Sequence, residues 1–269
     1  MSAAGQTAPN TAAPIVALRS VTKVFASATV ALEAVDFEVR AGEFVSLLGP
    51  SGCGKSTALR LLAGLIDPTR GAVVWGRAAD GRDRRRAQTL GFVFQEPTLM
   101  PWADVFDNVY LPLRLQGLSK AAAAPRVRSA LEGVGLAEAA RAYPRELSGG
   151  MRMRVSIARA LVTEPTLLLM DEPFAALDEM TRFRLNGDLL RLYRTLRKTV
   201  VFVTHSVFES VYLSSRIVIM TSSPGRIASQ LYIEAPYPRD ERFRTSAEYA
   251  GYCRRTSEAL ASAMGAERA

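Results

Sequence analysis

The sequence reads Gly49-Pro50-Ser51-Gly52-Cys53-Gly54-Lys55-Ser56 directly after an apolar run at 44–48, and this octet matches the pattern G-x-x-x-x-G-K-[ST]. The run is typical of a buried strand, and residues 58–65 are typical of a helix. Glycines let backbone N–H groups turn toward an anion, and the following helix presents its positive N-terminal end. This context predicts a nucleotide phosphate site in an α/β fold, with a chance glycine turn before a helix as the alternative.

Two side chains of the loop have the chemistry that nucleotide phosphates require. Lys55 can reach the β- and γ-phosphates, and the Ser56 hydroxyl can coordinate Mg²⁺. Residues 49–56 and Thr57 are therefore the expected nucleotide-binding residues. Cys53 is interpreted as a small space-filling residue within the loop.

Two carboxylates, Asp171 and Glu172, follow an apolar run at 167–170. Ligands of open α/β sheets bind at the carboxyl edge of such strands. Beside a phosphate loop, Asp171 is placed to hold Mg²⁺ through water, and Glu172 is placed to polarise the attacking water as a general base. A strand that simply ends in solvated acids is the alternative.

The only histidine, His205, follows the apolar run at 200–203 and so lies at a similar strand end. An isolated histidine is more often structural than catalytic. Its position, and not its residue type, makes His205 a candidate for the same site.

Composition narrows the possible functions. With 269 residues, 48% of them apolar, the chain can form one large core or a domain with a subdomain. No stretch reaches the roughly 18 apolar residues that span a bilayer. Residues 1–14 lack signal-peptide features, and the two cysteines fit a reducing compartment, so a cytosolic protein is expected. The net charge of +8 includes a basic run at 82–86, which we interpret as a solvated loop and not as a nucleic-acid contact.

Short apolar segments predict two kinds of sheet. Alternating segments suggest an antiparallel sheet at the N-terminal edge and lie at 15–21, 35–39, 71–75 and 91–94. Continuous apolar runs suit strands buried on both faces of a parallel sheet and lie at 167–170, 200–203 and 217–220. The sequence between 97 and 146 becomes helical and alanine-rich, with breaks at Pro112, 117–119 and 133–135. From residue 235 onward a polar helical tail is expected.

A second motif lies between the phosphate loop and the acidic pair. It reads Leu147-Ser148-Gly149-Gly150-Met151 and is similar to the signature of the ATP-binding cassette (ABC) ATPases. Residues 15–227 resemble a complete nucleotide-binding domain of that family, with all motifs in the family order. The resemblance implies an α/β fold with a mixed or parallel sheet core, an N-terminal antiparallel β-subdomain and an inserted helical subdomain.

The resemblance assigns roles to residues around one nucleotide. His205 corresponds to the switch histidine that contacts the γ-phosphate and orients the water and Glu172. Gln95 corresponds to the Q-loop glutamine, which senses Mg²⁺ and the attacking water. Phe25 lies where the family keeps a ring that stacks on adenine, although an ordinary apolar residue of an edge strand is the alternative.

The resemblance also implies a second copy of the chain. Ser148, Gly149 and Gly150 would cap the γ-phosphate of ATP held by that copy, through a hydroxyl and amides at a helix N-terminus. Asp178, in the D-loop at 176–178, would cross the dimer interface. Met151 and Met153 replace glutamines that are common in the family, but the expected anion contacts use neither side chain.

Several segments look like the nitrate, sulfonate and taurine importer ATPases. They are 95–102 with Asn108-Val109, the signature ending in Met151, 223–227 and Pro238-Arg239-Asp240. The resemblance therefore implies an ATPase that uses ATP and Mg²⁺, pairs with a second copy and docks membrane permease subunits near 97–108 on the cytoplasmic face of the membrane. A separate solute-binding protein would be an indirect partner. The implied division is a flexible tail at 1–14, an ATPase domain at 15–234 with a helical subdomain at about 97–165, and a C-terminal helical tail at 235–269.

Other functions remain as alternatives. The cargo could be another small solute, such as a vitamin or pyrimidine precursor. An unrelated phosphate-loop kinase or NTPase would not explain the signature, Gln95 and His205 in this order. A non-transport ABC protein that acts on ribosomes or DNA, and an exporter or lipoprotein-releasing ATPase, are the remaining readings.

Overall fold

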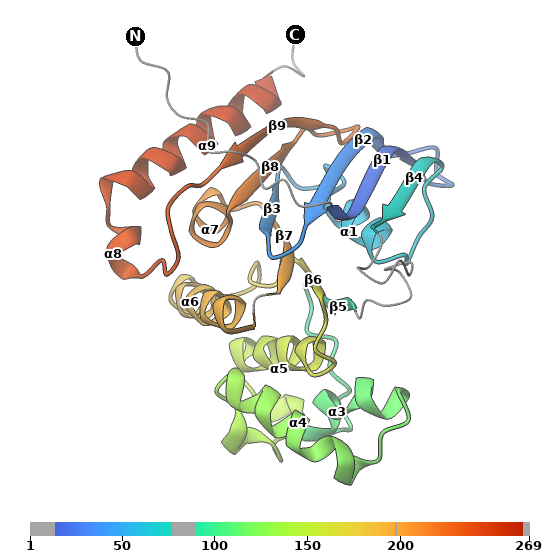
Figure 1. Ribbon diagram of the computed structural model, residues 1–269, viewed down its shortest axis with the longest axis vertical. Helices are drawn as coiled ribbons and strands as arrows, with labels where there is room; N and C mark the ends of the chain where they lie inside the picture. The colour runs from blue at the N-terminus through green and yellow to red at the C-terminus, as the bar shows by residue number, and fades with distance from the viewer. Residues whose placement is uncertain (1–13, 77–89, 197, 266–269) are drawn as a thin grey trace.

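The computed structural model describes residues 14–76, 90–196 and 198–265, and it contains two sheets. An antiparallel sheet has the strand order β2-β1-β4, and a six-stranded sheet has the order β5-β6-β7-β3-β8-β9 (Figure 1). The strands are β1 (Pro14–Val24), β2 (Val30–Arg40), β3 (Phe44–Leu48), β4 (Arg70–Trp75), β5 (Leu90–Val93), β6 (Leu167–Asp171), β7 (Thr199–Thr204), β8 (Arg216–Met220) and β9 (Ile227–Tyr232). This arrangement confirms the predicted fold class.

Helices connect and cover these strands. They are α1 (Lys55–Leu62), α3 (Val105–Leu115), α4 (Lys120–Gly133), α5 (Gly149–Leu161), α6 (Glu179–Leu196), α7 (Val207–Leu213), α8 (Glu241–Arg244) and α9 (Ala247–Gly265), with short 3₁₀ turns at Ala137–Ala139 and Pro144–Glu146. None of the helices within the described residues is long and apolar enough to cross a membrane.

Strands of the six-stranded sheet are buried on both faces, as their continuous apolar sequences predict. In β6, Leu167 and Leu169 pack in the core that contains Leu59 of α1. The alternate residues, Leu168 and Met170, pack in the core formed with α5 and α6. The sheet is parallel except for β9, which pairs antiparallel with β8 at one edge. Parallel strands end at a common edge, and this edge carries the candidate site.

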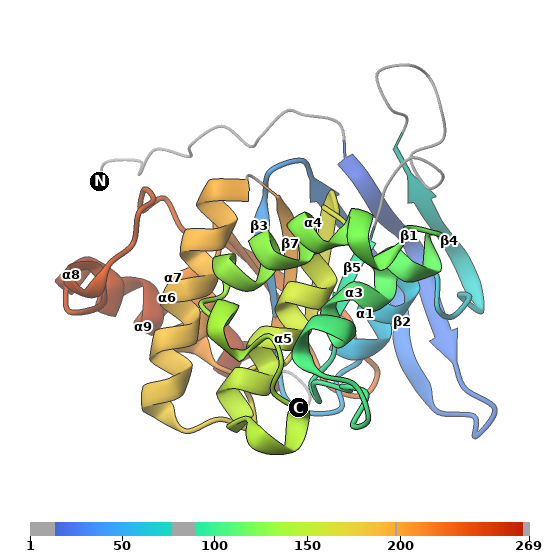
Figure 2. The ribbon, with the colours of Figure 1, turned by 90° about the horizontal axis from the view of Figure 1, so that it is seen from below.

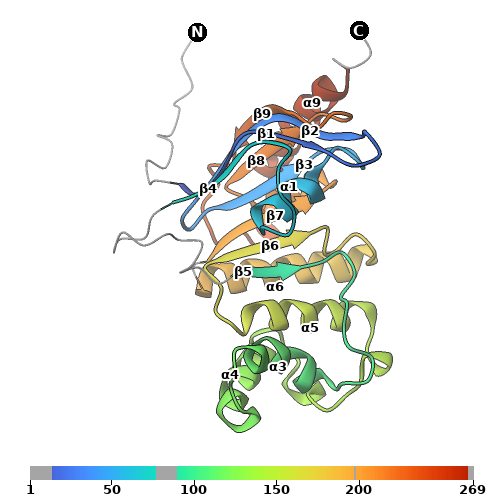
Figure 3. The ribbon, with the colours of Figure 1, turned by 90° about the vertical axis from the view of Figure 1, so that its right-hand side faces the viewer.

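Three helices pack against one another beyond β5 and β6. Helices α3, α4 and α5 lie at one end of the molecule, and β5 and β6 lie between them and the antiparallel sheet (Figures 1 and 3). Figure 2 shows α8 and the antiparallel sheet at opposite sides of the chain.

Helix α9 covers β8 and α7 through Tyr252 and Cys253, so the C-terminal segment packs on the body of the protein. The proposed division into domain, subdomain and tail stays a prediction.

Three sequence expectations are wrong in detail. The segment at 91–94 was expected in the antiparallel sheet, but β5 pairs in parallel with β6 in the central sheet. The helix expected at 58–65 begins at Lys55 and ends at Leu62, because the phosphate loop leads straight into it and Gly64 takes a positive φ of 67°. Pro112 lies inside α3 and does not break it.

Two expectations fall largely on residues that the structure does not describe. The tail expected at 1–14 lies outside the described residues, apart from Pro14, which begins β1. The basic run at 82–86 also lies outside them.

Candidate active site

The candidate residues gather at one edge of the six-stranded sheet because four parallel strands end there together. The register pairs Val93 with Met170, Asp171 with Val203, and Leu48 with Thr204. Glu172 and His205 directly follow β6 and β7, and Gly49 directly follows β3. Gln95 lies two residues beyond β5. The strand ends thus bring together chemistry that is far apart in the sequence.

Lys55 is buried, with 4% of its surface exposed, and its ammonium is held inside the loop. Its Nζ donates hydrogen bonds of 2.8 Å to the carbonyl oxygens of Gly49 and Pro50. The same Nζ lies 3.5 Å from Glu172 Oε1. A fixed cation between the loop and an acid is suited to a phosphate that arrives between them.

The backbone of the loop leaves the N-terminus of α1 open to an anion. Gly54 caps α1 with a φ of 90°, no side chain caps this helix end, and no acid lies in its first turn. A Cβ added to Gly54 would lie 2.5 Å from the carbonyl oxygen of Ala31, so only glycine fits there. Cys53, within the loop, is fully buried, and burial raises the pKa of its thiol. Thr57 is buried in the first turn of α1.

Of the three residues expected at Mg²⁺, which are Ser56, Gln95 and Asp171, the structure brings Ser56 and Asp171 into direct contact. Ser56 Oγ donates a hydrogen bond of 2.7 Å to Asp171 Oδ1. Burial raises the pKa of the Asp171 carboxyl, and the Ser56 hydrogen bond opposes this shift. Hydroxyl and carboxylate oxygens are the ligands that Mg²⁺ prefers, so the residues present fit this ion.

Glu172 stands between the loop cation and the histidine. Its backbone has a φ of 43°, an uncommon conformation for a residue other than glycine. From this turn, Oε1 faces Lys55 at 3.5 Å and Oε2 lies 3.0 Å from His205 Nδ1. The His205 side chain is half-exposed. A carboxylate held at both oxygens is oriented for the work of a general base.

Two further candidates lie at the margin of this cluster. Phe25 is 39% exposed in the turn after β1, with Lys23 Nζ 5.5 Å from its ring centre. The neighbouring β2 reaches the phosphate loop through Ala31, so the exposed ring lies on a hairpin that borders the loop. Gln95 is exposed, and its side chain forms no hydrogen bond with the described residues.

The signature residues form a second group in another part of the chain. Ser148 caps α5, and its Oγ accepts a hydrogen bond of 3.3 Å from Met151 N. Gly150 packs on α6, where an added Cβ would lie 2.8 Å from Thr181 Cγ2. A Cβ added to Gly149 would contact the side chain of Leu177. Helix α5 lies beyond β5 and β6 from α1 in two views (Figures 1 and 3).

Asp178 belongs to the second group. Its Oδ1 accepts a hydrogen bond of 2.9 Å from Thr181 N, and this bond lowers the pKa of the Asp178 carboxyl. The signature and the D-loop therefore lie against each other at the starts of α5 and α6, and α5 lies beyond β5 and β6 from α1, which begins with Lys55 (Figures 1 and 3).

Two supporting residues escaped the sequence-based reasoning. Gly225 packs against the phosphate loop, and an added Cβ would lie 2.1 Å from Cys53 O. Its segment was noted only for a family resemblance, and nothing local in the sequence indicates this contact. Arg159 of α5 donates hydrogen bonds to Pro97 O at 2.8 Å and Thr98 O at 2.9 Å, so it fixes the segment after Gln95.

The chain as a whole is similar to several known proteins. The family model described as ABC transporter matches residues 32–175. The aliphatic sulfonates import ATP-binding protein SsuB 2 of Burkholderia lata is 43% identical over 242 residues, which cover 90% of this chain and 85% of that protein. SsuB 1 of Pseudomonas savastanoi pv. phaseolicola is 46% identical over 222 residues, which cover 82% and 86% of the two chains.

A solved structure matches as well. It is the dimer of an ATP-binding cassette in a post-hydrolysis state with ADP and Pi bound. It is 33% identical, with a TM-score of 0.69, and the match covers 82% of this chain and all of that chain. The chain therefore belongs to the ABC transporter family, in which it is an ATP-hydrolysing, ATP-binding protein.

Proposed function

We propose that this chain is the ATPase of an importer for small anionic solutes of the sulfonate type, and that two copies bind two ATP molecules between them. The separation of the candidate residues into two groups is the observation that carries the proposal. One group surrounds Lys55 and Glu172, and the other surrounds Ser148 and Asp178. In a head-to-tail dimer, the second group of one copy completes the site of the other.

The proposed site uses each group for a separate task. Lys55 exchanges its two carbonyl partners for oxygens of the β- and γ-phosphates. The Ser148 hydroxyl and the amides at the start of α5 reach the γ-phosphate from the second copy. ATP then links the copies, because its γ-phosphate satisfies donors on both sides. Hydrolysis removes the link and lets the dimer open.

The proposed hydrolysis depends on Glu172 as general base. Its carboxylate accepts a proton from the attacking water, and the contact of 3.0 Å with His205 Nδ1 fixes its direction. Ser56 and Asp171 would hold Mg²⁺, with Gln95 as the residue that senses it. When bound, Mg²⁺ neutralises charge on the β- and γ-phosphates.

The proposed membrane contact lies on the loop after β5. Asn108 of α3 is fully buried and organises this loop, because its Oδ1 accepts from Met100 N at 2.8 Å and its Nδ2 donates to Ala103 O at 3.0 Å. Trp102, on the same loop, is 77% exposed. A rigid loop that presents a large apolar ring suits a permease subunit at the cytoplasmic face of the membrane.

The cargo is tested with the assembled transporter. Membrane and solute-binding partners are copurified with the chain, reconstituted in vesicles and assayed for ATP hydrolysis with ethanesulfonate, taurine, nitrate or a pyrimidine precursor. The proposal predicts that a sulfonate gives the strongest stimulation. If only the pyrimidine precursor stimulates ATP hydrolysis, the proposed sulfonate cargo is wrong. If the chain copurifies with nucleic acid instead of membrane proteins, the proposal that it serves an importer is wrong.

A further inference from the structure

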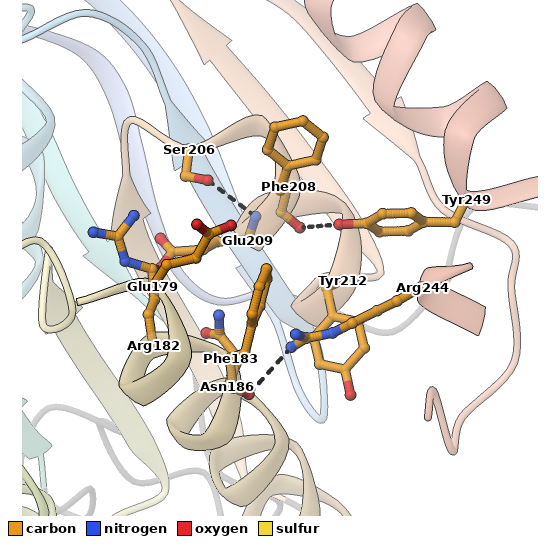
Figure 4. A pocket seen from close by; sticks show the side chains of 10 residues that line it. All are labelled: Glu179, Arg182, Phe183, Asn186, Ser206, Phe208, Glu209, Tyr212, Arg244 and Tyr249. Atoms are coloured by element: carbon orange, nitrogen blue, oxygen red, sulfur yellow. Dashed lines mark hydrogen bonds and ion pairs between the residues drawn. The ribbon is translucent and has the colours of Figure 1, made fainter. Parts of the chain in front are cut away.

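A cavity of about 330 Å³ lies between α6, α7 and the C-terminal helices, outside the site that holds Lys55. We name it the C-terminal pocket, and Figure 4 shows its lining. Its main residues are Arg182, Phe183, Phe208, Tyr212, Arg244 and Tyr249. Ligand pockets measure about 300–1,000 Å³, so this one has room for a compact molecule.

Arg244 of α8 supplies a fixed positive charge to the C-terminal pocket. Its guanidinium lies 3.7 Å from the ring centre of Tyr212 and 4.6 Å from that of Phe183. One of its nitrogens donates a hydrogen bond of 3.3 Å to Phe183 O. Within the described parts of the chain, no carboxylate lies within 4.0 Å of this guanidinium. The charge is therefore held in place but not neutralised.

The opposite wall of the pocket carries Arg182 and two acids, Glu179 and Glu209. Arg182 Nε lies 3.8 Å from Glu209 Oε1, so the two charges offset each other. The rings of Phe183 and Phe208 are 41% and 62% exposed, and Tyr249 donates its hydroxyl to Phe208 O at 3.0 Å. The pocket thus holds the Arg244 cation and exposed aromatic rings, with the acid Glu179 on the wall that carries Arg182 (Figure 4).

We propose that the C-terminal pocket binds a compact organic anion whose sulfonate or carboxylate pairs with Arg244 and whose flat apolar body packs on Phe183 and Phe208. Guanidinium groups bind such anions through charge-assisted hydrogen bonds, and aromatic rings favour a flat body. Binding does not depend on the proposed cargo. The anion could be the transported sulfonate or a carboxylate of the cell.

The pocket is joined to two catalytic segments, so its occupation changes ATP hydrolysis. Ser206, which follows His205, accepts a hydrogen bond from Glu209 N, and Thr204 donates its hydroxyl to the Glu209 carboxylate. Glu209 and Ser206 both line the pocket, as does Glu179, which follows Asp178. A ligand that shifts this wall therefore shifts the turn that carries His205.

Binding is measured by isothermal titration of the full chain with benzenesulfonate, benzoate and the neutral benzyl alcohol. We expect saturable binding of one anion per chain and no comparable binding of benzyl alcohol. Arg244→Gln removes the charge and weakens anion binding roughly tenfold or more. Arg242→Gln, on the same short helix but outside the pocket, leaves binding unchanged. Phe208→Ala removes an exposed ring and should weaken anion binding although the charge of Arg244 is kept.

Three results would overturn the proposal. They are no saturable anion binding, equal binding of benzyl alcohol, and anion binding that neither Arg244→Gln nor Phe208→Ala weakens. Circular dichroism establishes whether each variant is folded. If the Arg244→Gln chain does not fold, the Phe208→Ala chain still tests the proposal. Tighter binding of benzenesulfonate than of benzoate points to the cargo as the source, and the reverse order points to a cellular carboxylate. The proposal also requires that saturating anion change the rate of ATP hydrolysis by the wild-type chain. The same anion must leave the rate of the Arg244→Gln chain unchanged.

Discussion

Replacing Arg239 with methionine is expected to destabilise the chain strongly. Arg239 is 3% exposed, and burial lowers the pKa of its guanidinium. It donates hydrogen bonds to five backbone carbonyl groups, those of Val211, Tyr212, Ser214, Ile233 and Ala235. Its guanidinium also lies 4.4 Å from the ring centre of Tyr237. This one side chain thus ties the C-terminal segment to the end of α7.

The size of the loss follows from those contacts. Each buried carbonyl that loses its partner costs about 1–3 kcal/mol, while removal of a buried cation returns part of this sum. Breaking a comparable buried charged network costs about 3–5 kcal/mol, which we take as the expected loss for Arg239→Met. For a domain of this size, about 1 kcal/mol lowers Tm by about 2–4 °C, so a shift of roughly 6–20 °C is expected.

Urea unfolding followed by circular dichroism measures this loss. Arg242→Met is the matched control, because Arg242 is exposed three residues further along the chain. The control should change stability by less than about 0.5 kcal/mol. A loss below about 1 kcal/mol for Arg239→Met would refute the reasoning, since it would mean that the carbonyl groups find other partners at little cost.

Three substitutions test the active site. Glu172→Gln should retain ATP binding but lower the turnover by about 10² or more, the scale of a general base; wild-type turnover would remove Glu172 from that role. Lys55→Ala should weaken ATP binding in equilibrium titrations, and unaltered affinity would contradict the phosphate-loop assignment. Asp171→Asn should stop Mg²⁺-dependent hydrolysis. In the absence of nucleotide, the same substitution should raise Tm, because the raised pKa of Asp171 means that its ionised carboxylate is unfavourable in the folded chain. That gain in Tm should grow as pH rises through the folded-state pKa of Asp171 and disappear at lower pH.

The sequence was most informative where chemistry and fold coincide. The run at 44–48 and the glycine octet predicted a strand, a loop and a helix, and the structure confirms this order. The acids after 167–170 and the histidine after 200–203 were expected at strand ends, where the structure places them. Strand ends could be recognised because a continuous apolar run stops at a polar residue.

Features that depend on partners far along the chain could not be predicted. Strand β5 has only four residues, and so short a sequence gave no sign that its neighbour is β6. Arg239 was noted as part of a motif, but its carbonyl partners lie on α7 and in the segment after β9. The C-terminal pocket likewise collects residues from α6, α7, α8 and α9, which no local pattern joins.

The central claim is that each ATP site is shared between two copies of the chain. It is tested most directly by coexpressing a Lys55→Ala chain and a Ser148→Arg chain, with different tags, beside the membrane subunits. Each variant alone has two defective sites, whereas a mixed dimer has one intact site. The mixed dimer, isolated by both tags, should hydrolyse ATP at up to about half the wild-type rate. A dimer of the wild-type chain with the Lys55→Ala, Ser148→Arg double variant has no intact site and should be inactive. An inactive mixed dimer together with an active wild-type and double-variant dimer would contradict the shared site.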